Sequence, residues 1–294
     1  MRTLFILALL FVLTLAPLAA EEQYIHSAKW LEVPIDASQI ASQKQETYVC
    51  GYAAILNSLV NGSAKNRKVA LSLGKGPNER VKLLVDTYGS RPSSQGASPH
   101  RQTENGIQPG DLRDVSNELR SAHGLPPLTA TILERGRDET QKQLLTRIHG
   151  LLYKSLSMGE PPIILLDSYA AEWFPRFFSL ISDLLTGANP MQRECIWNRV
   201  SGHAVTVIGL PDAVNDDGSF CIKYLDSLTG KKERLFLYNP PRDFTGYQNT
   251  ANSRGWSKTS NFAFATGSTL DLNTSKRLWS ERTEIFLEFS IYKE

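Results

Sequence analysis

Residues 201–238 read SGHAVTVIGLPDAVNDDGSFCIKYLDSLTGKKERLFLY, and this stretch decides the fold class. Its β-branched and apolar runs predict three strands, HAVTVIGL (203–210), CIKYLD (221–226) and KKERLFLY (231–238). The segments between them, DAVNDDGSF and LTG, are rich in residues that favour tight turns. Because strands joined by short turns pair antiparallel, the stretch predicts an antiparallel sheet.

Further strand candidates lie on both sides of this stretch. They are PPIILLD (161–167) before it, and NFAFAT and EIFLEFSIYK near the C-terminus. WLEVPI, near the N-terminus, is a short strand candidate. The second half of the chain is therefore predicted to be mostly sheet.

The first half of the chain has helical periodicity instead. Apolar residues recur at helical spacing over 51–60, and Asn61-Gly62 ends the pattern. Three more helices are predicted, from ERVKLLVDTYG, from PGDLRDVSNELRSAHG and from residues 139–158. Residues 88–108, rich in Gly, Ser, Pro, Gln and Asn, are predicted to be a long surface loop. Helices followed by an antiparallel sheet indicate an α+β fold.

The N-terminus resembles a secretory signal peptide. Arg2 precedes an apolar run from Leu4 to Leu15, and the small residues Ala19 and Ala20 follow. We expect residues 1–20 to be removed and residues 21–294 to form a single domain with a core at about 43–240. The protein is then secreted or periplasmic, with no membrane association after cleavage. An uncleaved N-terminal anchor is the alternative.

The net charge and the cysteine content limit the kinds of partner and chemistry that we expect. The net charge of +2 and the lack of a dense basic run argue against nucleic acid as a partner. The three cysteines are Cys50, Cys195 and Cys221, an odd number for an exported chain. Cys195 and Cys221 are close in sequence, so we expect them to form a disulfide. Cys50 is then the free thiol.

Cys50 stands where the helix of residues 51–60 begins. The positive end of a helix dipole and a neighbouring imidazolium both favour the reactive thiolate. His203 is the best candidate for that imidazole, since it opens a buried strand and is rigidly mounted. The other histidines have simpler roles as surface or capping residues: His26, His100, His123 and His149.

Asp226 is the candidate third member of the site. It ends the strand that follows the His203 strand, and the two ends of an antiparallel hairpin meet in space. We therefore expect its carboxylate to orient His203. The Cys-to-His separation, 203 − 50 = 153 residues, is at or just beyond the ~130–150 typical of papain-type enzymes.

The chain resembles the papain superfamily of cysteine peptidases, in its bacteriocin-processing (peptidase C39-like) branch. The segments CGYAAILNSL, TENGIQPGDLRDVSNELRSAHGL and GEPPIILLD…SGHAVTVIGL…YLDSLTGK are similar to the active-site helix, the following helix and the sheet of that branch. The resemblance implies a papain-like fold, in which an N-terminal helical lobe carries the nucleophile and packs on the C-terminal sheet. It also implies an oxyanion-binding glutamine before the cysteine, for which Gln45 fits better than Gln43.

The resulting prediction is a cysteine peptidase or amidase that uses Cys50, His203, Asp226 and Gln45 on a peptide or protein substrate, with no cofactor. Inserted loops in the region 60–160 leave its specificity open. Two alternatives keep the fold. One is an acyl transferase of the transglutaminase or phytochelatin-synthase type, and the other is a catalytically idle binding protein that uses the 88–108 loop. A zinc site formed by Cys50, His203, Asp226 and Cys221 is disfavoured, because no paired ligand spacing supports it.

Overall fold

The computed structural model describes residues 29–42, 48–96, 98–172, 195–238, 246–249, 256–258, 262–266 and 280–294. The predicted signal peptide, Gln43 and Gln45 lie outside these residues. The helices of the described residues are α2 (Cys50–Val60), α3 (Ala64–Ser72), α4 (Pro77–Leu84), α5 (Pro109–Ala122) and α6 (Gln141–Ser157). None of them is long and apolar enough to cross a membrane.

Most strands join one sheet, which has the order β10-β9-β6-β5-β12-β11-β8-β7. Because β7 also pairs with β6, the sheet curls into a closed ring of strands. The strands are β1 (Trp30–Glu32), β2 (Gln102–Thr103), β3 (Gly106–Ile107), β4 (Thr129–Ile132), β5 (Ile163–Glu172), β6 (Cys195–Pro211), β7 (Phe220–Asp226), β8 (Lys232–Tyr238), β9 (Gly246–Asn249), β10 (Trp256–Lys258), β11 (Ala263–Thr266) and β12 (Ser280–Tyr292).

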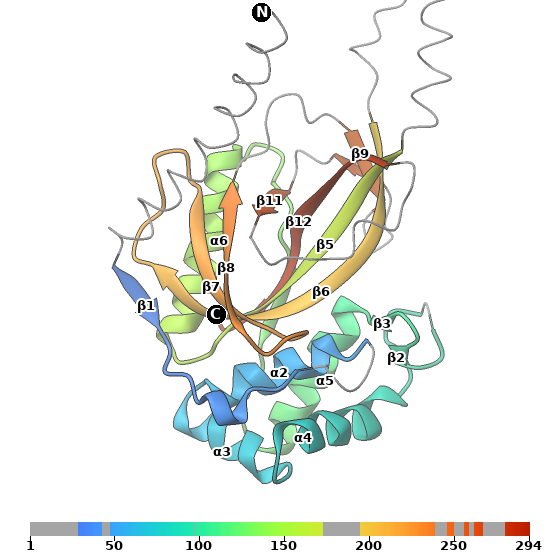
Figure 1. The fold of residues 1–294 in the computed structure, drawn as a ribbon, viewed down its shortest axis with the longest axis vertical. Coiled ribbons are helices and arrows are strands. Elements are labelled where there is room, and N and C mark those ends of the chain that lie inside the picture. Colours follow the sequence, from blue (N-terminus) through green and yellow to red (C-terminus); the bar gives the residue numbers. More distant parts are fainter. Residues whose placement is uncertain are drawn as a thin grey trace, which may run out of the picture.

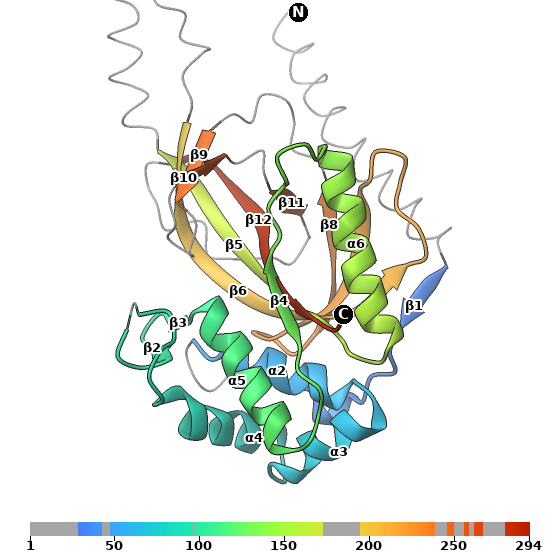
Figure 2. The same ribbon diagram turned by 180° about the vertical axis from the view of Figure 1, so that it is seen from behind.

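The α+β prediction is confirmed. Helices α2, α3, α4 and α5 form a layer at one end of the curled sheet, and α6 lies along the sheet (Figures 1 and 2). The pairings are antiparallel except for β6 with β9, which run parallel. The strand that carries His203 is longer than predicted, because β6 already begins at Cys195.

The burial of strand β5 on both faces explains why its sequence is continuously apolar rather than alternating. Ile163 and Leu165 pack with the helical layer, whereas Ile164 and Leu166 pack with α6 and the interior of the curled sheet. Both faces of the strand are buried, which requires apolar residues at successive positions. The sheet thus separates two hydrophobic cores.

Helix α2 is central to the first of these cores. All of its residues from Gly51 to Val60 are buried, and a helix that is apolar on every side is expected only inside a protein. Two of its buried polar side chains are paired with backbone outside the helix: Asn57 exchanges hydrogen bonds with the backbone of Ala41, and Ser58 donates to the carbonyl of Pro161. These contacts fix the helix that begins at Cys50.

Two expectations are corrected by the sheet and the loop. Cys195 pairs with Gly246 in β9, whereas Cys221 lies in β7, which pairs with β6 only from Val205 onward. The intervening strand covers tens of ångströms at ~3.3 Å per residue, so the expected Cys195–Cys221 disulfide does not fit this register. The 88–108 segment is not a simple loop, because it contains the two-stranded hairpin β2–β3.

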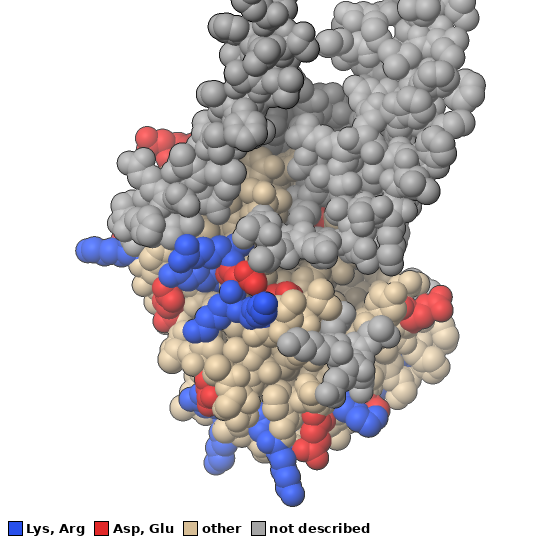
Figure 3. All heavy atoms as spheres, viewed as in Figure 1, with Lys and Arg blue, Asp and Glu red and all other residues tan. Residues whose placement is uncertain are grey.

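The charge distribution matches the near-neutral composition. On the face of the molecule in Figure 3, Lys and Arg side chains lie beside Asp and Glu. Ion pairs among the described residues include Arg147 with Glu139 and Arg67 with Asp36. The described part of this face therefore carries mixed charge.

Candidate active site

Three predicted site residues meet where the helical layer joins the sheet. Cys50 is the first residue of α2, His203 lies in β6, and Asp226 is the last residue of β7. The Cys50 thiol hydrogen-bonds to the His203 ring, and His203 Nε2 lies 2.6 Å from Asp226 Oδ1. The fourth predicted residue, Gln45, lies outside the described residues.

The sheet register places the histidine and the carboxylate together. The last β6–β7 pair is Val205 with Asp226, two residues from His203. Beyond it, β6 continues beside β5, where Leu166 is opposite His203. The site therefore forms where β7 ends and β6 continues, which corrects the expectation that His203 begins its strand.

Asp226 is held by the turn that follows it. Its Oδ1 accepts a hydrogen bond from the Leu228 amide at 2.8 Å, and its Oδ2 accepts one from Thr229 Oγ1 at 2.8 Å. Burial alone raises the pKa of Asp226, but these bonds and the adjacent His203 outweigh burial and lower it. The carboxylate stays ionised and fixes the plane of the imidazole.

His203 is arranged to carry a proton. The side chain is 8% exposed, and burial by itself lowers its pKa. The hydrogen bonds with Asp226 and Cys50 and the charges of these two residues reverse this effect and raise the pKa of His203 to about 9. Since Nε2 faces Asp226, the other ring nitrogen, Nδ1, is left for the thiol.

The thiol of Cys50 is stabilised as a thiolate. Burial alone raises its pKa, but the hydrogen bond and charge of His203, together with the backbone N–H groups of Ala204 and Gly51, lower it overall. Cys50 also lies at the start of α2, where the first N–H groups have no intrahelical acceptor. A thiolate–imidazolium pair follows from these opposite shifts.

A buried hydrogen bond joins helix α2, which carries Cys50, to strand β6, which carries His203. Thr206 Oγ1, three residues after His203, donates to the carbonyl of Ala54 in α2 at 3.0 Å. Both residues are fully buried. Strand β6 and helix α2 are thus joined one helical turn away from the thiol, which limits relative movement of the sulfur and the imidazole.

Removing this hydroxyl will lower stability. Thr206→Val keeps the shape of the side chain, and we expect the free energy of unfolding to fall by about 1 kcal/mol, the net value of one hydrogen bond. Urea denaturation followed by tryptophan fluorescence measures the change. The half-buried Thr131, whose hydroxyl donates to the carbonyl of the next residue, Ile132, provides the control Thr131→Val. Equal midpoints for both variants would contradict the structural role of Thr206.

Some neighbours of the site were not predicted. The support from Leu228 and Thr229 has a sequence signal, since Asp followed by Ser, Thr and Gly is typical of a side-chain-capped turn. The backbone at Tyr48, which has φ of 65°, has no such signal.

Among the described histidines outside the site, His149 differs from expectation, whereas His26 lies outside the described residues. His149 is buried rather than a surface or capping residue: its Nε2 lies 2.9 Å from the carbonyl oxygen of Pro211, and its ring contacts Tyr153 and Phe220.

No metal site is found among the residues that the structure describes. The four residues Cys50, His203, Asp226 and Cys221 do not converge, because Cys221 lies five residues before Asp226 along β7 and is opposite Phe236 of β8.

The sequence matches no known protein-family model, and no curated protein sequence is significantly similar to it. The fold and the side-chain geometry are therefore the basis for the function proposed next.

Proposed function

We propose that this chain is an exported, papain-like cysteine peptidase or amidase that cleaves a peptide or isopeptide bond. One observation carries the proposal: the thiol of Cys50, the imidazole of His203 and the carboxylate of Asp226 are connected by hydrogen bonds in that order. Export rests on the sequence of residues 1–20 alone.

The proposed reaction begins with nucleophilic attack. The Cys50 thiolate sulfur attacks the substrate carbonyl carbon, and the carbonyl oxygen takes the negative charge. The backbone N–H of Cys50, at the start of α2, is placed to donate to that oxygen, with Gln45 as the expected second donor. The helix dipole favours charge at the same position.

Proton transfer by His203 completes the first half of the cycle. The imidazolium gives its proton to the leaving amine as the carbon–nitrogen bond breaks, and a thioester with Cys50 remains. The neutral imidazole then takes a proton from water, whose oxygen attacks the thioester. The carbon–sulfur bond then breaks and the carboxylic acid leaves, which restores the Cys50 thiolate and the His203 imidazolium. Asp226 keeps the ring oriented throughout.

Covalent labelling by an epoxide inhibitor of cysteine peptidases tests the proposal. We expect mass spectrometry of the wild-type protein to find one adduct, on Cys50, and none in Cys50→Ala. Cys221→Ala is the matched control, because Cys221 is a buried thiol of β7 outside the site. Absence of an adduct on wild-type Cys50, or equal labelling of wild type and Cys50→Ala, would reject the proposed chemistry.

A further inference from the structure

The hairpin β2–β3 contacts both sides of the nucleophile. Gln102 Nε2 donates to the carbonyl of Tyr48 at 3.3 Å, and a Cβ on Gly106 would lie 3.5 Å from the same oxygen. On the other side, Ile107 packs so closely on Gly51 that a Cβ there would lie 2.7 Å from Ile107 Cγ2. Residues 102–107 thus touch the backbone two residues before Cys50 and one residue after it.

Tyr48 is held in an unfavourable conformation. Its φ of 65° is in the left-handed region, where a residue with a large side chain is strained, and its side chain is 53% exposed. Such conformations persist only where the surroundings hold them. Within the described residues, the hairpin contacts this backbone through the hydrogen bond from Gln102, and Gly106 lies beside the same carbonyl oxygen.

The hairpin is too short to hold itself in place. Each strand has two residues, and two-stranded ribbons are only marginally stable even when longer. Thr103 Oγ1 donates to the Gly106 carbonyl at 2.8 Å, which closes the turn but does not attach it to the protein. Its position therefore depends on what precedes it.

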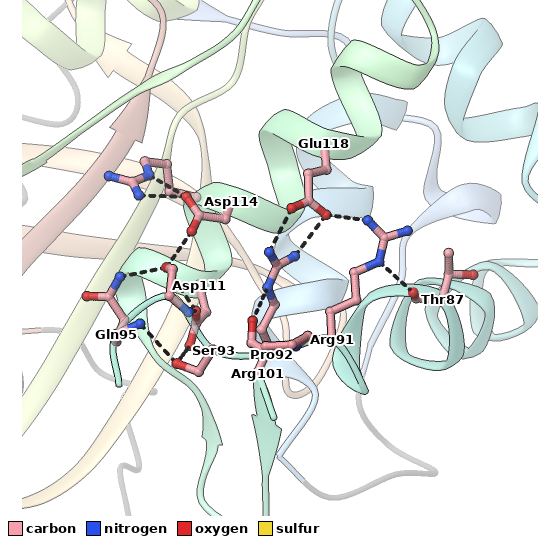
Figure 4. A network of polar contacts seen from close by, with 11 residues as sticks. Thr87, Arg91, Pro92, Ser93, Gln95, Arg101, Asp111, Asp114 and Glu118 are labelled. Atoms are coloured by element: carbon pink, nitrogen blue, oxygen red, sulfur yellow. Dashed lines mark hydrogen bonds and ion pairs between the residues drawn. The ribbon is translucent and has the colours of Figure 1, made fainter. Parts of the chain in front are cut away.

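An ion pair with α5 supplies the first attachment. Arg101, which directly precedes the hairpin, donates from Nη1 and Nη2 to the two carboxylate oxygens of Glu118 at 2.9 and 2.7 Å. Arg91 donates to Glu118 at 2.6 Å, and the Arg101 amide donates to the Arg91 carbonyl at 3.0 Å (Figure 4). A two-pronged contact of this kind fixes orientation as well as distance.

A second attachment lies at the start of the same helix. The buried carboxylate of Asp111 accepts from Ser93 Oγ at 2.6 Å and from the Ser94 amide at 2.8 Å (Figure 4). Both attachments are on α5, which packs on Gly51 through Leu112. The segment and the nucleophile therefore share one support.

We propose that residues 91–96 and 98–107, which we name the clamp, position Cys50 for reaction with His203, and that Arg101 and Glu118 are positioning residues. The inference rests on the proposed function. The clamp holds the strained backbone at Tyr48 and the close packing at Gly51, so that Cys50 between them has one orientation. Displacements near 1 Å at such a site can cost ~10²-fold in rate.

Glu118→Gln tests the clamp, with Glu139→Gln as its matched control. Glu139 forms a similar two-pronged ion pair with Arg147, at the end of α6 away from the helical layer (Figure 2). The first measurement is the rate of Cys50 alkylation by iodoacetamide against pH. The second is the kcat and KM for hydrolysis of a mixed peptide library.

For Glu118→Gln we expect about tenfold slower alkylation at neutral pH, a midpoint shifted to higher pH, and a lower kcat with KM little changed. Glu139→Gln should match wild type in both measurements. Gln102→Ala leaves the ion pair intact and removes the hydrogen bonds from Gln102 Nε2 to the carbonyls of Tyr48 and Thr103, so it should shift alkylation in the same direction. This second variant keeps the proposal testable if Glu118→Gln does not fold.

Two results separate the clamp from the function that it serves. Wild-type alkylation rates and midpoints in both Glu118→Gln and Gln102→Ala would overturn the clamp and leave the proposed function standing. A wild-type Cys50 that reacts with a midpoint no lower than that of an ordinary thiol, pKa ~8.5, would overturn the proposed function and the clamp with it.

Discussion

Replacement of His203 by alanine will reduce hydrolysis of a mixed peptide library by about 10⁴-fold, the upper end of what a positioned acid–base group contributes. His203 has two roles in the proposed cycle, because its hydrogen bond and charge lower the pKa of Cys50 and its proton goes to the leaving amine. Loss of the ring removes both effects. Product formation followed by mass spectrometry gives the ratio of kcat/KM between the two proteins.

The pH dependence of Cys50 alkylation shows whether the loss has this cause. In wild type, the lowered pKa of Cys50 keeps the thiolate populated at a lower pH than in an ordinary thiol, and reactivity falls as acid protonates it. In His203→Ala, burial remains and raises the pKa of the thiol, so the alkylation midpoint moves to higher pH.

A buried histidine outside the site provides the control for this prediction. His149 is 9% exposed, close to the 8% of His203, and its ring bonds the Pro211 carbonyl. His149→Gln should lower stability without moving the alkylation midpoint. An unchanged midpoint in His203→Ala would show that the imidazole does not activate Cys50.

Removal of the Asp226 carboxylate is expected to have the second largest effect. Asp226→Ala leaves His203 Nε2 without its partner in a buried site, and a hydrogen bond to a charged group contributes ~1.5–3 kcal/mol, which corresponds to a loss of about 10²-fold in kcat/KM. Asp226→Asn keeps an oxygen that can accept from Nε2 and should recover part of this loss, about tenfold.

The alkaline side of the pH–activity profile distinguishes two roles of Asp226, the orientation of the His203 ring and the stabilisation of its positive charge. The carboxylate helps to raise the pKa of His203 to about 9, so the imidazolium persists up to that pH. In both Asp226 variants this support is lost, and the alkaline limb should move to lower pH. Asp217 accepts from Ser219 at the other end of the same hairpin, so Asp217→Asn is the matched control. An alkaline limb at the wild-type position in Asp226→Asn would contradict the charge role.

The local elements of the fold were largely predictable. The start of α2 at Cys50, the start of α5 at Pro109 and the end of β7 at Asp226 follow the expected boundaries. These features depend on short-range rules, since periodicity defines a buried face and glycine or proline defines an end. The meeting of His203 and Asp226 was also predictable, because a hairpin fixes which ends of its strands are adjacent.

Long-range features were not predictable in the same way. The expected Cys195–Cys221 disulfide relied on closeness in sequence, but β6 extends over 17 residues and carries Cys195 to the far end of the sheet. Strand length depends on partners that come from distant parts of the chain, here β5 and β9. The hairpin of residues 102–107 was missed for the same reason, because its order depends on ion pairs with α5.

The sequence by itself determined the element types, the α+β class and the three residues in which the proposed chemistry resides. Only the tertiary structure decided that Cys50 faces His203, that the pKa values of the pair shift in opposite directions, and that Gln102 of the hairpin contacts the backbone beside the thiol. The physical reason is the difference in range between the interactions involved. Backbone preferences act between neighbours along the chain, whereas burial, charge and hydrogen-bond geometry depend on groups that meet only after the chain has folded.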